Sequence, residues 1–338
     1  MKLKPGTSRE TAEETREDLD HNPYVFIVGC PRSGTTLLRR MVDAHRQIAI
    51  TRETHWITKR FERRQGVTPD GLVTPELLSW LLSDERFTRM GIGQDELEGL
   101  VAGEEPVSYS TLVTGVFDLY GKGQGKRLVG DKTPGYVRRI PTLHALWPKA
   151  RFVHLIRDGR DVCMSILNWR KAERVLGRFS TWAEDQVTTA ALWWEWHVRL
   201  GREDSGSLPP KLYHEVRYEA LVSESAKECE KLCCFLDLPY DDAMLKFHEG
   251  RTKMKPGRDA KKAWLPITSG LRDWSEQMRA EDLERFEAAA GNLLEELDYP
   301  RACPHPPDET LAWAVRIRQS LSREASASGK RLPKGWER

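Results

Sequence analysis

Residues 29–36 read Gly-Cys-Pro-Arg-Ser-Gly-Thr-Thr, and these residue types at this spacing suit the binding of a phosphate group. The backbone N–H groups of a loop hinged by glycines turn toward one point, and the helix that follows adds the positive end of its dipole there. The ATP-binding loop G-x-x-x-x-G-K-[ST] needs a lysine directly after its second glycine. This chain has Thr35 at that position, and its nearest cation is Arg32. The loop therefore predicts a phosphate-bearing donor other than a nucleoside triphosphate.

A second candidate for phosphate binding follows a later predicted strand. Arg157 ends that strand, and Ser165 lies eight residues on, inside the next predicted helix. An arginine fork together with a hydroxyl suits a terminal phosphate. The alternative is that Arg157 belongs with Asp158 and Arg160 to a network of interactions within the turn.

Lys132 and Glu53 are the candidates for catalysis, and each follows a predicted extended segment. Lys132 could reach a transferring group as a mobile point charge, or it could be an ordinary surface lysine. Glu53 could serve as a general base toward a hydroxyl acceptor, or it could form a salt bridge with Arg52 or Arg32. Ligands of open parallel sheets bind at the carboxyl ends of the strands, so we expect these side chains to meet in one crevice.

The elements that must position these residues are strands that alternate with helices. Apolar runs predict strands at residues 24–29, 127–129, 151–156 and 211–217, with a short extended segment at 47–50. The clearest helical patterns cover residues 37–44, 75–82, 107–120, 162–170, 181–202, 223–236 and 280–297. Asp161 and Ser223 are the expected N-caps of two of these helices. The pattern predicts an α/β fold of three layers, in which helices cover both faces of a mostly parallel sheet.

The chain is expected to contain a single α/β domain with an extension at each end. Residues 1–22 form a charged leader without the apolar core of a secretory signal. Residues 23–300 form the domain, and residues 301–338 form a tail with an amphipathic basic helix. We expect that helix to pack on its own domain or on a second subunit rather than on a membrane. The tryptophans of residues 181–202 are expected to pack in the core.

Composition narrows the function classes. The 338 residues are 39% hydrophobic and 31% charged, which is typical of a soluble globular protein. A net charge of +2 gives no sign of nucleic-acid binding, and no apolar run approaches the ~20 residues that span a bilayer. The six cysteines show no metal-ligand spacing, so we expect free thiols, a cytoplasmic location and no bound metal.

Four motifs together resemble the sulfotransferase family, in the order in which the family carries them. They are residues 29–38, residues 131–134 (Asp-Lys-Thr-Pro), residues 157–162 with Ser165, and residues 217–219 (Arg-Tyr-Glu). The likeness covers residues 24–299 in patches. It is greatest to the branch that includes tyrosylprotein sulfotransferases and many bacterial sulfotransferases. In that branch a Glu-Thr pair also follows the loop by about twenty residues, as residues 53–54 do here.

The resemblance implies a P-loop-type fold and 3′-phosphoadenosine 5′-phosphosulfate (PAPS) as the donor, with adenosine 3′,5′-bisphosphate (PAP) as the product. The implied 5′-phosphosulfate ligands are Arg32, Ser33, Gly34, Thr35 and Thr36. The implied ligands of the remaining donor groups are Arg157 and Ser165 for the 3′-phosphate and Tyr218 near the adenine. Glu53 would remove the acceptor proton, and Lys132 with Arg32 would stabilise charge on the moving group. The basic loop at residues 251–262 would cover the nucleotide.

The sequence thus predicts transfer of a sulfuryl group to an acceptor hydroxyl by in-line displacement without a metal ion. A P-loop kinase that uses ATP and a non-catalytic nucleotide-binding protein are the alternatives. The acceptor could be a sugar, a lipid, a phenolic compound or a peptide, and a homodimer is possible. His55 stands where the tyrosylprotein branch has an arginine, which weighs against a protein tyrosine as the acceptor and leaves open whether His55 shares the role of base.

Overall fold

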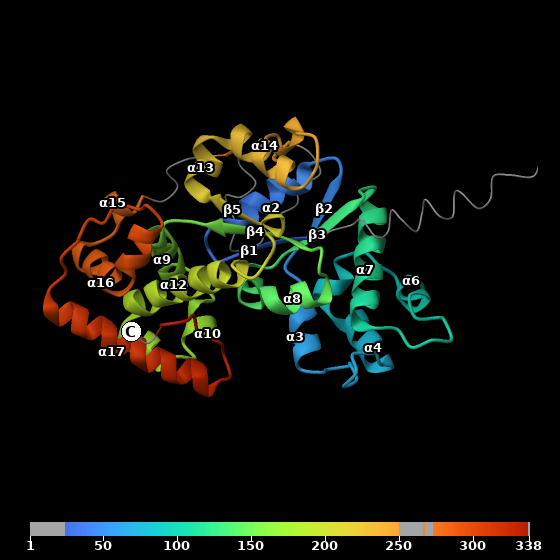
Figure 1. Cartoon of the computed structure of the whole chain (residues 1–338), viewed down its shortest axis with the longest axis horizontal. Coiled ribbons are helices and arrows are strands. Elements are labelled where there is room, and N and C mark those ends of the chain that lie inside the picture. Colours follow the sequence, from blue (N-terminus) through green and yellow to red (C-terminus); the bar gives the residue numbers. More distant parts are fainter. Residues whose placement is uncertain (1–23, 250–265, 268–272, 337–338) are drawn as a thin grey trace, which may run out of the picture.

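A five-stranded sheet forms the centre of the protein, and all of its paired strands are parallel (Figure 1). The computed structural model describes residues 24–249, 266–267 and 273–336, so the predicted leader and the basic loop at 251–262 lie outside the described residues. In the described part of the chain the strand order is β2-β3-β1-β4-β5. The strands are β1 (Val25–Gly29), β2 (Ile48–Thr51), β3 (Leu128–Lys132), β4 (Arg151–Ile156) and β5 (Tyr213–Arg217). The predicted parallel sheet is confirmed, and the short extended segment at 47–50 contributes its edge strand β2.

Strand β1 shows why a nearly continuous apolar run was needed at this position. Val25 and Ile27 pack into the core on one face of the sheet, whereas Phe26 and Val28 pack into the core on the other. A parallel strand covered on both faces must be apolar on both, because neither row of side chains meets water.

Helices cover both faces of the sheet, as predicted. In Figure 1 the helices α13 and α14 lie above the sheet, and α12 and α8 lie below it. One face carries α2 (Thr35–Ala44), α13 (Tyr218–Ser223), α14 (Ser225–Phe235) and η3 (Asp242–Met244). The other face carries α7 (Tyr109–Gln124), η1 (Pro134–Arg139), α8 (Ile140–Leu146), α9 (Gly159–Leu167) and α12 (Gln186–Ser205).

The remaining helices extend these layers at the two sides of the molecule (Figure 1). On the side of α7 lie α3 (Trp56–Glu62), α4 (Pro75–Ser83), α5 (Glu85–Thr88) and α6 (Gln94–Gly99). Around α12 lie α10 (Ala172–Leu176), α11 (Ser180–Glu184), α15 (Trp274–Gln277), α16 (Ala280–Glu296) and α17 (Asp308–Ala327), and η2 (Pro210–Leu212) precedes β5. Helix α17 is the predicted tail helix, and it packs on α12 and α16 through Ala314, Ile317 and Leu321.

Two predicted helix caps are wrong, and one predicted helix is interrupted. Helix α9 begins at Gly159, so its cap is Asp158, which accepts the N–H of Arg160 at 2.9 Å. The predicted cap Asp161 lies inside the helix. Ser223 ends α13 and donates back to a carbonyl of that helix, so it cannot cap α14.

The predicted helix over residues 181–202 is divided at Asp185 into α11 and α12. Asp185 is extended, with φ −153°, and its carboxylate accepts the N–H and the hydroxyl of Thr188. The same carboxylate accepts the indole N–H of Trp313 on α17, so the break joins three helices. The core packing of the tryptophans is confirmed: Trp193 and Trp196 are buried, with their rings edge to face at 5.9 Å.

Candidate active site at the carboxyl ends of the strands

The loop from Cys30 to Gly34 joins the end of β1 to the N-terminus of α2, where the sequence predicted a phosphate cradle. Helix α2 begins at Thr35, two residues earlier than expected, and Gly34 precedes it with φ 101°. Arg32 has φ 82°, a left-handed conformation that costs a non-glycine residue about 1–3 kcal/mol and is typical of functional loops. The hydroxyl of Ser33 is buried and has no hydrogen-bond partner. The loop therefore offers a hydroxyl and a helix N-terminus to an anion.

The two glycines of the loop are needed for close approach as well as for their backbone angles. A Cβ at Gly29 would lie 2.5 Å from the carbonyl oxygen of Leu155 on β4. A Cβ at Gly34 would lie 2.5 Å from the ring of Tyr218, directly after β5. The ring of Tyr218 therefore lies against the loop, where the predicted adenine contact would be made.

Glu53 and Lys132 meet at the same edge of the sheet. The Nζ atom of Lys132 lies 2.6 Å from Oε1 of Glu53 and 3.4 Å from the hydroxyl of Thr36 on α2. The lysine is only 4% exposed, so the alternative of a surface lysine is wrong. The other carboxylate oxygen of Glu53 lies 3.0 Å from Nε2 of His55. Glu53 thus forms a salt bridge with Lys132 and a hydrogen bond with His55.

The charge on Glu53 is stabilised strongly. Burial acts to raise the pKa of Glu53, but the Lys132 ammonium and the hydrogen bond with His55 outweigh it and hold that pKa well below its usual range. The glutamate side chain is still 42% exposed, so an acceptor can reach it. Glu53 is therefore an ionised carboxylate whose partner Lys132 also contacts Thr36, at the start of the helix after the β1 loop.

Asp131 fixes the segment that carries Glu53. The carboxylate is fully buried and accepts the hydroxyl of Thr51 at 2.9 Å and the N–H of Thr54 at 3.3 Å, so it holds the residues on both sides of Glu53. Its Oδ1 atom has no partner. Burial raises the pKa of Asp131 to about 6, although hydrogen bonds from the neighbouring threonines act to lower it.

Arg157 lies at the end of β4 with part of its guanidinium unused. Its Nη2 atom donates to Asp161 at 2.6 Å, and its guanidinium lies 4.1 Å from the ring centroid of Tyr218. Its Nε atom is buried without a partner. The indole of Trp194 donates to the carbonyl of Arg157 and so fixes the backbone at this position. Arg157 could therefore accept a further anionic ligand.

The sequence left open that Arg157 forms a network within the turn with Asp158 and Arg160. In the structure Asp158 and Arg160 pair with each other. Arg160 is fully buried and donates to both carboxylate oxygens of Asp158 and, at 2.8 Å, to Glu287 on α16. Its guanidinium also lies 3.5 Å from the ring centroid of Trp274. Arg160 is thus a structural arginine that ties α9 to α16.

Arg32 and Ser165, two of the residues predicted for the site, form a hydrogen bond with each other. The Nε atom of Arg32 donates to the hydroxyl of Ser165 at 3.1 Å, and its guanidinium lies 5.6 Å from the ring centroid of Trp169. The structure thus brings all the predicted side chains to the carboxyl ends of the five strands, with Glu53 following β2. It joins Ser165 to Arg32, whereas the sequence grouped that serine with Arg157.

Three residues at this edge had no part in the predicted site, although Asp161 was expected to cap a helix. Asp161 pairs with Arg157, Asp131 supports the Glu53 segment, and Glu219 accepts the N–H of Asp158 at 2.9 Å. Asp161 stands four residues after Arg157 at the start of a helix, a spacing that places two side chains on one face. That spacing was the available signal for the pair.

The site suits an anionic ligand. Ser33, Arg157 and the N-terminus of α2 offer donors, and Lys132 and Arg32 supply charge. Among the described residues, no group of three or more His, Cys, Asp or Glu side chains could hold a metal ion. The described helices include none long and apolar enough to cross a bilayer.

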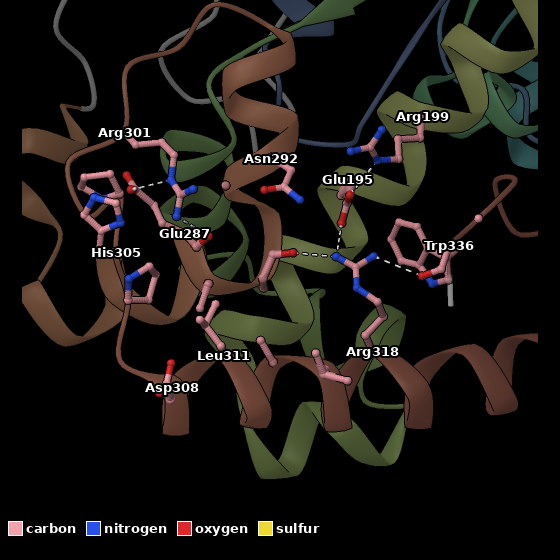
Figure 2. Close-up of a pocket in the computed structure, with 18 of the residues that line it drawn as sticks. Glu195, Arg199, Glu287, Asn292, Arg301, His305, Asp308, Leu311, Arg318 and Trp336 are labelled. Carbon is pink, nitrogen blue, oxygen red and sulfur yellow. Dashed lines mark hydrogen bonds and ion pairs between the residues drawn. The ribbon is translucent and has the colours of Figure 1, made fainter. Parts of the chain in front are cut away.

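A cavity of about 710 Å³ lies elsewhere, between α12, α16, α17 and the last described residues (Figure 2). Its walls include Glu195, Glu287, Arg301 and Arg318, and none of the residues predicted for the site. Figure 2 shows Arg318 bonded to Glu195, and Arg301 turned toward Glu287. The charged groups of this cavity are therefore largely neutralised by one another.

A parallel α/β sheet with an anion-binding loop after its central strand defines a class of proteins that bind phosphate-bearing nucleotides. Within that class the chain belongs to the sulfotransferase family, because the model of that family matches residues 23–242. The fold agrees: a sulfotransferase domain from the curacin biosynthetic pathway superposes with a TM-score of 0.52 at 21% identity, over 92% of this chain and 98% of that domain.

Curated relatives also match at the level of sequence. Protein-tyrosine sulfotransferase A of Caenorhabditis elegans is 28% identical over 66% of this chain and 52% of its own length. The protein-tyrosine sulfotransferase of Drosophila melanogaster is 26% identical over 86% of this chain and 54% of its own length. The chain thus spans about half the length of these two relatives.

Proposed function

We propose that the protein is an enzyme that transfers the sulfuryl group of PAPS to an acceptor hydroxyl. The observation that carries this proposal is the ion pair of Lys132 and Glu53, whose Nζ and Oε1 atoms lie 2.6 Å apart. The pair lies beside the predicted phosphate-binding loop, which has Thr35 where ATP-binding loops have a lysine. The carboxylate of Glu53 could accept a proton from the acceptor. The ammonium of Lys132 could contact the sulfuryl group during its transfer. Membership of the sulfotransferase family supports the choice of reaction.

The donor would lie across the ends of β1, β4 and β5. Residues 32–36 would hold its 5′-phosphosulfate with backbone N–H groups and with the hydroxyls of Ser33, Thr35 and Thr36. Arg157 would bind the 3′-phosphate through the part of its guanidinium that Asp161 leaves unused, with Ser165 as a second donor. Tyr218 would lie against the adenine, since its ring already stands between Gly34 and Arg157.

Glu53 would take the proton of the acceptor hydroxyl as the acceptor oxygen forms its bond to sulfur. The bond from sulfur to the bridging oxygen breaks on the opposite side, and PAP leaves with the electron pair. Lys132 and Arg32 would stabilise the charge that gathers on that oxygen. Lys132 lies near both Glu53 and Thr36, so a turn of its ammonium toward the leaving oxygen would weaken its hold on Glu53. The carboxylate would then become a stronger base as the charge develops.

Thermal stabilisation by nucleotides tests the donor. The melting temperature is expected to rise more with PAP than with ATP at equal concentration, because a ligand that binds only the folded state stabilises it. Turnover with PAPS should continue in EDTA, since cationic side chains would replace Mg²⁺. A larger shift with ATP, or a strict need for Mg²⁺, would favour the kinase alternative.

The acceptor is sought among sugars, lipids, phenolic compounds and peptides that carry a hydroxyl. A screen of these classes with labelled PAPS identifies the product. The non-catalytic alternative predicts PAP binding without labelled product from any class. The homodimer and the cytoplasmic location remain predictions from the sequence.

A further inference from the structure

Three cations converge beside the active site although they lie far apart in the chain. Arg138 belongs to η1, Arg178 lies between α10 and α11, and Lys330 follows α17. Within the ranges that the structure describes, none of the three forms an ion pair, and the Nε atom of Arg138 is buried without a hydrogen-bond partner. We call these three residues the cationic cluster.

Aromatic rings form the floor of the cationic cluster. The guanidinium of Arg138 lies 5.2 Å from the ring centroids of both Trp193 and Trp196. Phe179 lies between the other two cations, 5.1 Å from Arg178 and 4.4 Å from the ammonium of Lys330. Cation–π contacts of this kind hold a cation over a ring but leave its charge uncompensated.

The three cations repel one another. Burial, followed by the repulsion of Arg178 and Arg138, lowers the pKa of Lys330 to about 8. Burial and the charges of Arg139 and Arg178 lower the pKa of Arg138 to about 9. Uncompensated like charges at partly buried positions are unfavourable, so an anion that joined them would be bound strongly.

The acidic side chains near the cationic cluster form hydrogen bonds or salt bridges with residues outside the cluster. Glu324, the acid that acts on Lys330, accepts the N–H and the hydroxyl of Ser180. Glu62, which acts on Arg138, accepts a hydrogen bond from Thr142 and forms a salt bridge with Arg139. The thiol of Cys30 also faces Arg138, but burial raises the pKa of that thiol far above neutral, so it carries no charge. These acids offset only part of the positive charge, since the pKa values of Lys330 and Arg138 remain lowered, and an anionic ligand would offset the rest.

The position of the cationic cluster relates it to the transfer reaction. Helix η1 begins two residues after Lys132 and packs against β1, whose end leads into the phosphate-binding loop. Cys30 is the first residue of that loop after β1, and the positive charge of Arg138 acts to lower the pKa of its thiol. A ligand held by the cluster would therefore lie beside the donor rather than in its place.

We propose that Arg138, Arg178 and Lys330 bind a carboxylate or phosphate group of the acceptor, while the buried rings of Phe179, Trp193 and Trp196 hold the three cations in place. The proposal rests on the sulfuryl transfer proposed above, and it narrows the acceptor to molecules that carry an anionic group besides the reacting hydroxyl.

Small aromatic anions test this site in protein saturated with PAP, so that the phosphate-binding loop is already filled. Isothermal titration with benzoate and phenyl phosphate is expected to detect binding of at least one, whereas neutral benzamide should bind far more weakly. Stronger binding of benzoate would identify a carboxylate as the preferred group, and stronger binding of phenyl phosphate would identify a phosphate.

Arg178→Gln should weaken the preferred anion about tenfold, since each charge-assisted hydrogen bond contributes about 1.5 kcal/mol or more. Arg178 is exposed, so this variant should fold normally. Arg174→Gln, an exposed arginine on the adjoining helix α10, is the matched control and should leave binding unchanged.

Equal binding of benzamide, no binding of either anion, or an equal loss in the Arg174→Gln control would overturn the site. The response to PAP is measured first and separately. A protein that binds the anions but not PAP would keep the anion site and contradict the proposed donor.

Discussion

Two regions of this protein, the strand ends and the cavity of Figure 2, differ in how their charged side chains are paired. The crevice at the strand ends leaves the hydroxyl of Ser33, one oxygen of Asp131 and the Nε atom of Arg157 without partners. In the cavity of Figure 2, between α12, α16 and α17, charged side chains pair with one another: Arg318 donates to Glu195 at 2.6 Å, and Arg301 lies 3.6 Å from Glu287. The Nε atom of Arg301 and the indole N–H of Trp336 have no hydrogen bond there. A buried polar group without a partner is costly unless a ligand completes it, and at the strand ends two such groups belong to Ser33 and Arg157, which the sequence predicted to bind an anion.

Arg157 and Arg160, which lie in one turn, likewise differ in how fully their donors are paired. Arg160 has donors engaged with Asp158, Glu287 and a backbone carbonyl, which leaves little capacity for a ligand. Arg157 has one carboxylate partner and a free Nε atom. Arg157 is therefore available for recognition, and Arg160 stabilises the fold.

The largest effect is expected from Glu53→Gln in the crevice. Loss of the general base should lower turnover with PAPS about 10²–10⁴-fold, with PAP affinity nearly unchanged. A rate assay together with titration of PAP measures both quantities. Retained turnover would remove Glu53 from the role of base and would weaken the contrast between the two regions.

The buried Asp131 predicts a dependence of stability on pH. Its pKa of about 6 in the folded state exceeds the value near 4 of an unfolded chain, so the folded state binds more protons between these values. Stability should therefore fall as the pH rises from about 4 to about 6, by about 3 kcal/mol in total. The Asp131→Asn variant should lack this change, as denaturant titrations across the window would reveal. An identical slope in the variant would contradict the assignment.

Substitution of the two arginines should have opposite consequences. Arg157→Met is expected to weaken PAP about 10- to 100-fold and to lower the melting temperature less than Arg160→Met, because Asp161 loses one ion pair but still accepts the N–H of Trp274. Arg160→Met should lower the melting temperature strongly, because it leaves the buried Glu287 without its arginine on α9. Equal effects on PAP affinity would show that the two arginines cannot be distinguished by their partners.

The smallest effect is expected in the cavity of Figure 2. Arg318→Met should reduce the free energy of unfolding by about 2 kcal/mol, because Glu195 keeps its bond to Arg199. Turnover and PAP affinity should stay at the level of the unmodified protein. A loss of turnover without a loss of stability would give this cavity a part in the reaction.

The sequence was sufficient to place the residues predicted for the donor at one edge of the sheet, because each feature there is local. The loop at residues 29–36, Lys132 and Arg157 each follow an apolar strand directly, and parallel strands bring such ends together. Even here, the sequence offered two aspartates near the start of α9, Asp158 and Asp161, and the wrong one was predicted to cap the helix. Asp158 caps the helix, which left Asp161 for Arg157.

The cationic cluster could not be predicted in the same way. Arg138, Arg178 and Lys330 lie on three separate segments that meet only because α12 and α17 pack together. No spacing in the sequence relates them. Likewise, the break at Asp185 depends on Thr188 and on Trp313 of a distant helix. Contacts of this kind depend on tertiary packing, which local patterns do not encode.

The position of Tyr218 has a consequence for how the protein is made. Strand β1 is the first of the five strands to be synthesised, yet it lies at the centre of the sheet and cannot be enclosed until β3 and β4 have emerged. The ring that covers Gly34 follows β5, the last strand. A growing chain on the ribosome must therefore expose the edge of β4 until residue 217 is available. The proposed nucleotide site is therefore completed late in synthesis, so PAP should not protect a nascent chain that ends before Tyr218.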